Sequence, residues 1–183
     1  MTEAKVIDTD FHSRLIADKD HLCEVAGLQP KYLMESMTKY CKETEVDWVR
    51  KFPQYRAEGL PGLILTKVEN PDTRCQAICG ALIRNYVDAR VIPVNTMMDM
   101  HDAGHGDAIT PTVVLIPNMF VTVSGKSVPA WKVQILYDML LARSVQSKPT
   151  VAYVEDMTTL MAQFGKPFAD FLSGFRMVKG QVV

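Results

Sequence analysis

The chain has 183 residues, of which 48% are apolar, and this length suits one compact domain with a sizeable core. Lys and Arg number 20 against 21 Asp and Glu, so a formal net charge of -1 provides no overall positive field toward DNA or an anionic membrane. No signal peptide and no apolar run long enough to span a bilayer is evident, which predicts a cytoplasmic protein without a membrane partner.

Residues 1–59 show the spacing of helices. Apolar residues recur three and four positions apart in three successive stretches, which are separated by glycine and proline. We expect a short helical N-terminal region. Its aromatic residues Trp48, Phe52 and Tyr55 are expected to be buried against the rest of the protein rather than to form an exposed stripe.

From residue 60 onward, short apolar runs alternate with longer amphipathic segments. The strand candidates are 60–65, 89–94, 112–116, 150–154 and 175–178, and the helix candidates are 72–87, 129–143, 156–164 and 167–172. Strands that are apolar throughout and alternate with helices predict a parallel sheet covered on both faces. The expected α/β core is residues 60–183, with Asp72 or Thr73 as the N-cap of its first helix.

The only Gly-Lys-Ser of the chain, at 125–127, has the spelling that ends a phosphate-binding P-loop. A P-loop reads GxxxxGK[ST] and joins a buried strand to a helix, so that backbone N–H groups converge on phosphate. Phe120 stands where the first glycine would be, and the segment follows the third strand candidate. We therefore interpret 125–127 as a polar loop. A phosphate site would instead belong to the turn after 60–65.

Several segments, in chain order, resemble the ATPase domain of the DnaC-like helicase loaders and the IstB-like transposition helpers, which are AAA+ proteins. The segments are GLQPKYLMESMTKYC (27–41), AEGLPGLIL (57–65), ARVIPVNTMMDM (89–100), VVLIPNMFV (113–121) and YDMLLARSVQSKPTVAYVEDMTTLMAQFGKPFADFL (137–172). The resemblance implies a three-layer α/β fold of the P-loop NTPase (AAA+) type, with a five-stranded parallel sheet.

The resemblance also locates the nucleotide-binding positions, and different residues stand there. In the P-loop, Lys67 and Asp72 stand in place of the two glycines, and Thr73 and Arg74 stand in place of the Lys and the Thr. Pro117 and Asn118 stand in place of the Walker-B acids. Glu155 replaces the Asn that ends the fourth strand, and Phe171 replaces the Arg of the last helix. Bulky and acidic residues in the turn from Asn70 to Arg74 disfavour binding of a phosphate. The residues that would bind Mg²⁺ and the arginine that would stabilise the transition-state charge are also absent from these positions. We therefore expect a pseudo-ATPase without a nucleotide cofactor.

A second cluster has the residue types of a metal site. His101 and His105 stand four residues apart, with Asp102 and Asp107 beside them, which suits zinc. Two glycines interrupt the segment and argue against a rigid helix. We interpret 100–108 as a solvated loop and expect no metal cofactor, with these residues as the alternative.

The four cysteines form no CxxC pair, so neither disulfides nor a zinc motif is indicated. Cys75 and Cys79 are spaced to share one helix face as two metal ligands. Because no further pair is nearby, we interpret both as small core residues.

Basic residues of the C-terminal half are candidates for contact with DNA or a partner. They are Lys126, Lys132, Arg143, Lys148, Lys166 and Arg176. No aromatic residues are interleaved with them, so DNA contact follows from the resemblance rather than from the pattern.

The resemblance implies a protein that binds a replicative helicase, a related AAA+ ATPase or DNA, in DNA replication or mobile-element processing. The altered positions predict that it does so without hydrolysing ATP. Self-association is also expected, since domains of this family assemble side by side. One alternative is an enzyme, either an NTPase using Lys67, Lys126 and Glu155 or a metal hydrolase built on the His101 and His105 loop; another is a structural scaffold of an unrelated complex.

Overall fold

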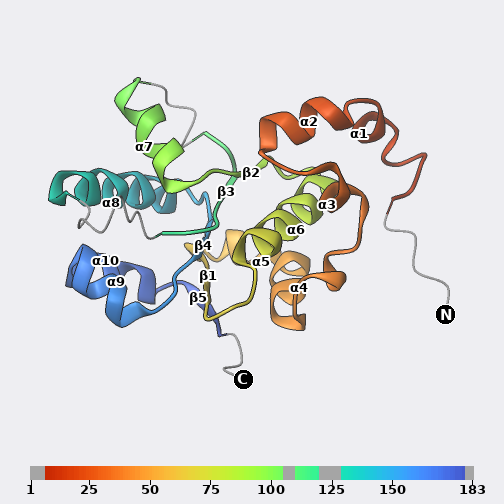
Figure 1. Cartoon of the computed structure of the whole chain (residues 1–183). Coiled ribbons are helices and arrows are strands. Elements are labelled where there is room, and N and C mark those ends of the chain that lie inside the picture. Colours follow the sequence, from red (N-terminus) through yellow and green to blue (C-terminus); the bar gives the residue numbers. More distant parts are fainter. Residues whose placement is uncertain (1–6, 105–109, 120–128, 180–183) are drawn as a thin grey trace.

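The computed structural model describes residues 7–104, 110–119 and 129–179. Its strands form one parallel sheet of five strands in the order β2-β3-β4-β1-β5 (Figure 1). They are β1 (Gly62–Thr66), β2 (Ala89–Val91), β3 (Val113–Ile116), β4 (Thr150–Tyr153) and β5 (Arg176–Lys179). The predicted α/β class and the predicted parallel sheet are confirmed.

The helical character predicted for the N-terminal region is also confirmed. Its elements are α1 (Ser13–Ala17), α2 (Lys19–Ala26), α3 (Pro30–Met34), the 3-10 helix η1 (Met37–Lys39), α4 (Glu43–Arg50) and α5 (Phe52–Ala57). Trp48 and Phe52 are only 1% and 4% exposed, as expected. Tyr55 is half-buried and packs against the same core.

The two faces of the sheet carry two separate cores. Leu63 and Leu65 of β1 face a core shared with the N-terminal helices and α6 (Pro71–Arg84), whereas Ile64 faces the opposite core. Alternate residues of a strand point to opposite faces, so this division follows from the pleat. The second core is covered by α7 (Val94–Asp102), α8 (Ala130–Val145), α9 (Met157–Phe164) and α10 (Lys166–Ser173). Figure 1 shows the resulting three layers.

Helix α3 docks closely on α6. A Cβ on Gly80 of α6 would lie 2.2 Å from the carbonyl oxygen of Tyr32, so only glycine allows this approach. Arg84 fixes the same contact, because its guanidinium donates to the carbonyl oxygens of Tyr32 and Leu33 at 3.1 and 2.8 Å. The N-terminal region is thereby held against α6, the helix that leaves β1.

The N-cap prediction for α6 was wrong. The helix begins at Pro71, and the N-cap residue Asn70 makes no side-chain capping hydrogen bond. Proline suits the first helical position because its fixed φ is already helical and its missing N–H would have no partner there. None of the helices in the described ranges combines the length and apolar character needed to cross a bilayer.

Candidate functional site

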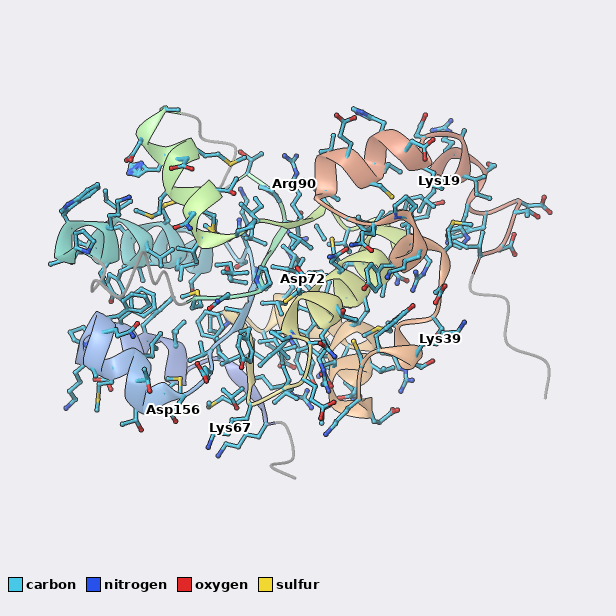
Figure 2. The ribbon with its side chains drawn as sticks, viewed as in Figure 1. Lys19, Lys39, Lys67, Asp72, Arg90 and Asp156 are labelled. Atoms are coloured by element: carbon cyan, nitrogen blue, oxygen red, sulfur yellow. The ribbon has the colours of Figure 1, made fainter. Side chains whose placement is uncertain are left out.

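The turn after β1 lies at the place where open α/β sheets bind ligands. Strands β1 and β4 are neighbours, and the helices that follow them, α6 and α9, leave toward opposite faces of the sheet. In open α/β sheets, ligands bind outside the carboxyl ends of strands arranged in this way, and the turn after β1 lies at that edge. Figure 2 shows Lys67 and Asp156 there. A hydrogen bond from the Thr159 backbone lowers the pKa of Asp156 most, and the charge of Lys67 lowers it further.

The turn itself, residues 67–70, keeps a backbone that favours glycine. Lys67 and Asn70 have φ values of 50° and 48°, in the left-handed region that side chains disfavour. Between them Val68 is only 6% exposed and packs into the core beneath the turn. The turn is thus anchored from below by an apolar side chain.

Arg74, which the resemblance aligns with the P-loop hydroxyl, forms a buried ion pair. Its guanidinium contacts the Glu45 carboxylate of α4, which is 0% exposed. The second oxygen of Glu45 accepts from the Lys42 backbone N–H at 3.1 Å and from the Thr44 hydroxyl at 3.2 Å. Arg74 Nε also donates to the Glu69 carbonyl oxygen at 3.2 Å, which ties the turn to the helix.

The two preceding residues are engaged within the chain as well. The Tyr32 hydroxyl of α3 donates to Thr73 Oγ1 at 3.2 Å. Asp72 Oδ2 accepts from Gln76 Nε2 at 2.7 Å, and Gln76 Oε1 accepts from the Gln29 backbone at 3.0 Å. The N-terminal region and α6 therefore hold the side chains that would face a phosphate.

The electrostatics of this edge disfavour an anion. Lys67 is exposed, and so are Glu69, Asp72 and Glu155, while Asp156 is half-buried beside them. Pro71 also removes one of the backbone N–H groups that a helix N-terminus would offer. Lys179, which lies opposite Thr66 at the end of β5, adds a second exposed lysine, so four carboxylates stand against two lysines and the edge remains net negative.

Three of the remaining nucleotide positions lie at the same edge of the sheet, and Phe171 does not. Pro117 and Asn118 follow β3, and Glu155 follows β4, so they share the edge that carries Lys67. Phe171 instead packs edge-on against Tyr137 and Phe175, with ring centres 5.6 and 5.4 Å away. It belongs to the core between α8 and α10.

The alternative metal site is only partly within the described residues. His101 and Asp102 lie exposed in the last turn of α7, so the predicted loop begins later than residue 100. The helix continues there because Met97 and Met98 are buried and Met100 packs on the same core. His105 and Asp107 lie outside the described residues. Within the described ranges, no three His, Cys, Asp or Glu side chains are placed to hold a metal.

The interpretation of Cys75 and Cys79 as core residues is confirmed, because both are 0% exposed. Burial raises the pKa of each cysteine thiol, in the case of Cys41 to about 12. A protonated thiol is a poor nucleophile.

We therefore expect the folded protein to react with iodoacetamide at pH 8 at least about tenfold more slowly than free cysteine. In urea, all four thiols should react at the ordinary rate. Mass spectrometry of the alkylated chain measures both rates, and rapid labelling of any one cysteine in the folded protein would contradict the expectation.

The basic residues proposed for DNA or partner contact do not form one surface. Arg143 is 0% exposed and donates to the carbonyl oxygens of Pro111, Thr112 and Pro149, so its interpretation as a surface contact was wrong. Burial lowers its pKa to about 10, which leaves it charged at neutral pH.

Arg176 contacts the Tyr55 hydroxyl and Asp47, so it fastens β5 to the N-terminal helices. Lys166 is exposed, Lys132 and Lys148 are half-buried, and Lys126 lies outside the described residues. Among the five of these residues that the structure describes, Lys166 fits a surface role best.

Sequence reasoning missed Glu45 and Tyr32, which complete the site from the N-terminal region. A signal for Glu45 was present, because it stands three and seven positions before Trp48 and Phe52 and so shares their buried helix face. A carboxylate on such a face needs a buried cation. Arg74 on the apolar helix α6 is that cation.

No protein-family model matches the sequence, and no curated protein does either. Solved structures with the same fold were found at low identity. A crystal structure of the DnaC helicase loader has a TM-score of 0.63 and 10% identity over 82% of this chain and 99% of that chain. A DnaI structure has a TM-score of 0.56 and 14% identity over 83% and 94%.

The replication initiator DnaA, bound to AMPPCP and single-stranded DNA, has a TM-score of 0.62 and 10% identity over 85% of this chain. The chain spans about half the length of the initiators it matches, 50 to 51%. The strand order and these matches agree, and the chain has the α/β fold of P-loop AAA+ domains such as those of DnaC and DnaA.

Proposed function

We propose that the protein is a non-catalytic, helicase-loader-like protein that binds a replicative helicase or a related AAA+ ATPase, with DNA as a further ligand. Its role would lie in DNA replication or in the processing of mobile elements. The observation that carries the proposal is the Glu45–Arg74 ion pair. It occupies the place where a P-loop hydroxyl would bind Mg²⁺ and phosphate.

The fold supports the partner class. Its solved likenesses include a helicase loader and a replication initiator bound to a nucleotide analogue and single-stranded DNA. This chain spans nearly the whole of the loader structure, 99%, but about half of the initiator, 51%.

The residues at the edge of the sheet support the absence of catalysis. Phosphoryl transfer needs a phosphate cradle, Mg²⁺ ligands and a cation for the transition-state charge. The turn is anchored by Val68 and Arg74, Pro117 has no ligand atom, and Phe171 is packed among aromatic rings. The residues at these positions therefore have structural roles and do not supply the groups that phosphoryl transfer requires.

Isothermal calorimetry with ATP and Mg²⁺ tests the missing cofactor. We expect no saturable heat up to millimolar ATP and no phosphate release. Micromolar binding that is lost in Lys67→Ala but kept in Lys19→Ala would contradict the proposal, because only Lys67 lies beside the turn. Lys19 on α2 is half-buried, with a side chain that is 37% exposed, and it serves as the control because it lies far from Lys67 (Figure 2).

Affinity capture from the native cell tests the partner. We expect a replicative helicase or a related DNA-processing ATPase to be recovered with the protein, with or without added ATP. Nuclease treatment of the extract then separates direct protein contact from DNA bridging. Recovery of proteins from an unrelated complex alone would favour the scaffold alternative.

A further inference from the structure

A groove follows the end of α6 that is farther from the turn after β1. It consists of two adjoining hollows of about 500 Å³ and 410 Å³, which lie between α4, α5 and the end of α6 (Figure 1). We call it the arginine groove, because Arg50, Arg56 and Arg84 line it. Helix α6 has 14 residues, so its length separates the groove from the turn by about 20 Å. The arginine groove is therefore a different surface from the candidate functional site.

The floor of the arginine groove is apolar. Val46, Val49 and Val87 are half-buried in it, and Phe52 lies at the junction of the two hollows. Among the lining residues that the structure describes, Phe52 is the only aromatic one, and it is 4% exposed. Single-stranded nucleic acid is held by stacking of its bases on accessible aromatic rings. The floor therefore suits the apolar side chains of a peptide better than it suits bases.

Arg84 is a buried cation without an anionic partner. It is 7% exposed, and its Nη1 makes both hydrogen bonds to the carbonyl oxygens of Tyr32 and Leu33. Across the described ranges, Nε and Nη2 make no hydrogen bond and no carboxylate pairs with the guanidinium. Burial lowers the pKa of Arg84 to about 10, so it is charged at neutral pH. A buried charge is costly unless it is paired, so this position favours an incoming anion.

The two unused donors of Arg84 have the geometry that binds a carboxylate. In a guanidinium group, Nε–H and one N–H of Nη2 lie side by side and parallel, so they can donate to both oxygens of one carboxylate. Such charge-assisted hydrogen bonds are about twice as strong as neutral ones. A carboxylate that enters the larger hollow would therefore supply the counter-charge that the fold leaves out.

The other two arginines extend the positive charge along the groove. Arg56 is exposed, and its Nε donates to the Ser147 carbonyl oxygen at 3.2 Å. Arg50 lies 3.6 Å from the Glu43 carboxylate, with both side chains more than half exposed, so this pair is weak. No aspartate or glutamate is among the described residues that line either hollow. The groove thus offers three cations against one carboxylate in a protein whose net charge is -1.

We propose that the arginine groove binds an acidic peptide segment of a partner protein. A carboxylate of the segment pairs with Nε and Nη2 of Arg84, a neighbouring apolar side chain lies on the valine floor, and further acidic residues face Arg50 and Arg56. The sign of the charge and the apolar floor together define the partner's chemistry, which is acidic and apolar residues in alternation. This inference does not rest on the proposed function, because it concerns a different surface.

Fluorescence anisotropy with a labelled probe peptide tests the binding in the full chain. The probe repeats Asp-Leu-Glu-Phe three times, and the control peptide has Asn and Gln in place of its acids. We expect saturable binding of the probe that weakens as salt is added, and at least about tenfold weaker binding of the control peptide. Absence of saturable binding overturns the proposal. So does displacement of the bound probe by oligothymidine of the same net charge at equal or lower concentration, which would identify nucleic acid as the occupant.

Two charge reversals test where the probe binds. Arg50→Glu and Arg56→Glu change exposed side chains, so both variants should fold, and each is expected to weaken probe binding at least about fivefold. Arg14→Glu is the matched control, since Arg14 is also exposed but lies on α1 outside the groove. If Arg14→Glu lost as much affinity, the attraction would be general rather than local, and the proposal would fail.

Arg84→Lys tests the paired donors themselves. Lysine keeps the charge and can still donate to the carbonyl oxygens of Tyr32 and Leu33, but it lacks two parallel N–H groups. We expect at least about tenfold weaker probe binding with an unchanged circular dichroism spectrum. In the unaltered chain, the NMR signal of the Arg84 Nε–H group should shift when the probe is added. A signal that stays in place while the probe binds overturns the proposal, and this measurement holds even if Arg84→Lys does not fold.

Discussion

An Arg74→Met variant is expected to lose about 3 to 5 kcal/mol of its free energy of unfolding, which is the usual cost of breaking a buried ion pair. Glu45 is 0% exposed, so its carboxyl group would be left in the interior without its cation, which is costly. The variant also loses the hydrogen bond from Arg74 Nε to the Glu69 carbonyl oxygen, which holds the turn after β1. Urea unfolding followed by circular dichroism measures the loss.

Two further variants show whether the loss of stability comes from the buried Glu45–Arg74 ion pair itself. In Glu45→Gln with Arg74→Met no charge is left, and the Gln side chain can still accept from the Lys42 backbone N–H, so this protein should be more stable than Arg74→Met alone. Arg50→Met is the surface control. Its guanidinium pairs with Glu43 at 3.6 Å with both side chains more than half exposed, so the expected loss is under about 1 kcal/mol. Equal losses in Arg74→Met and Arg50→Met would contradict the role given to the buried pair.

The sheet could be predicted from the sequence because its strands are local signals. Residues 62–66 are buried throughout, and 113–116 likewise, so short apolar runs between amphipathic segments identify strands covered on both faces. The helices of the N-terminal region follow from apolar spacing in the same way. The order of the strands was not predicted, since periodicity says nothing about which strands are neighbours.

The contacts that fill the candidate site could not be predicted in this way. Arg74 and Glu45 are 29 positions apart and Tyr32 and Thr73 are 41 apart, and hydrophobic periodicity does not encode such pairings. The helical spacing that Trp131 shares with Leu136 and Leu140 predicted a core residue, which was wrong, because Trp131 is 54% exposed. The position of a turn after β1 could be predicted from the sequence, whereas the partners of Thr73 and Arg74 come from another part of the chain.

The N-terminal region consequently does more than precede the sheet. Tyr32 of α3 and Glu45 of α4 each bind a residue of the first turn of α6. These contacts hold the first turn of α6 against the N-terminal region, so stability measurements on Arg74 test how firmly the two parts of the chain are joined.

An Arg143→Ala variant is expected to lose at least about 3 kcal/mol of unfolding free energy, because hydrogen bonds to a charged group contribute more than neutral ones and their loss strands buried acceptors. The guanidinium donates to Thr150 Oγ1 and to the carbonyl oxygens of Pro111, Thr112 and Pro149, at 3.0 to 3.3 Å. These contacts join the end of α8 to the segments that enter β3 and β4. Thermal and urea unfolding measure the effect.

Lys166→Ala supplies the contrast, since Lys166 is exposed and its loss should change stability by no more than about 0.5 kcal/mol. Arg143→Lys distinguishes charge from geometry. A lysine keeps the charge but cannot direct donors to several carbonyl oxygens at once, so it should recover only part of the loss. If Arg143→Ala were as stable as Lys166→Ala and weakened DNA or partner binding instead, Arg143 would be a surface contact after all, and its burial beneath β3 and β4 would have to be reconsidered.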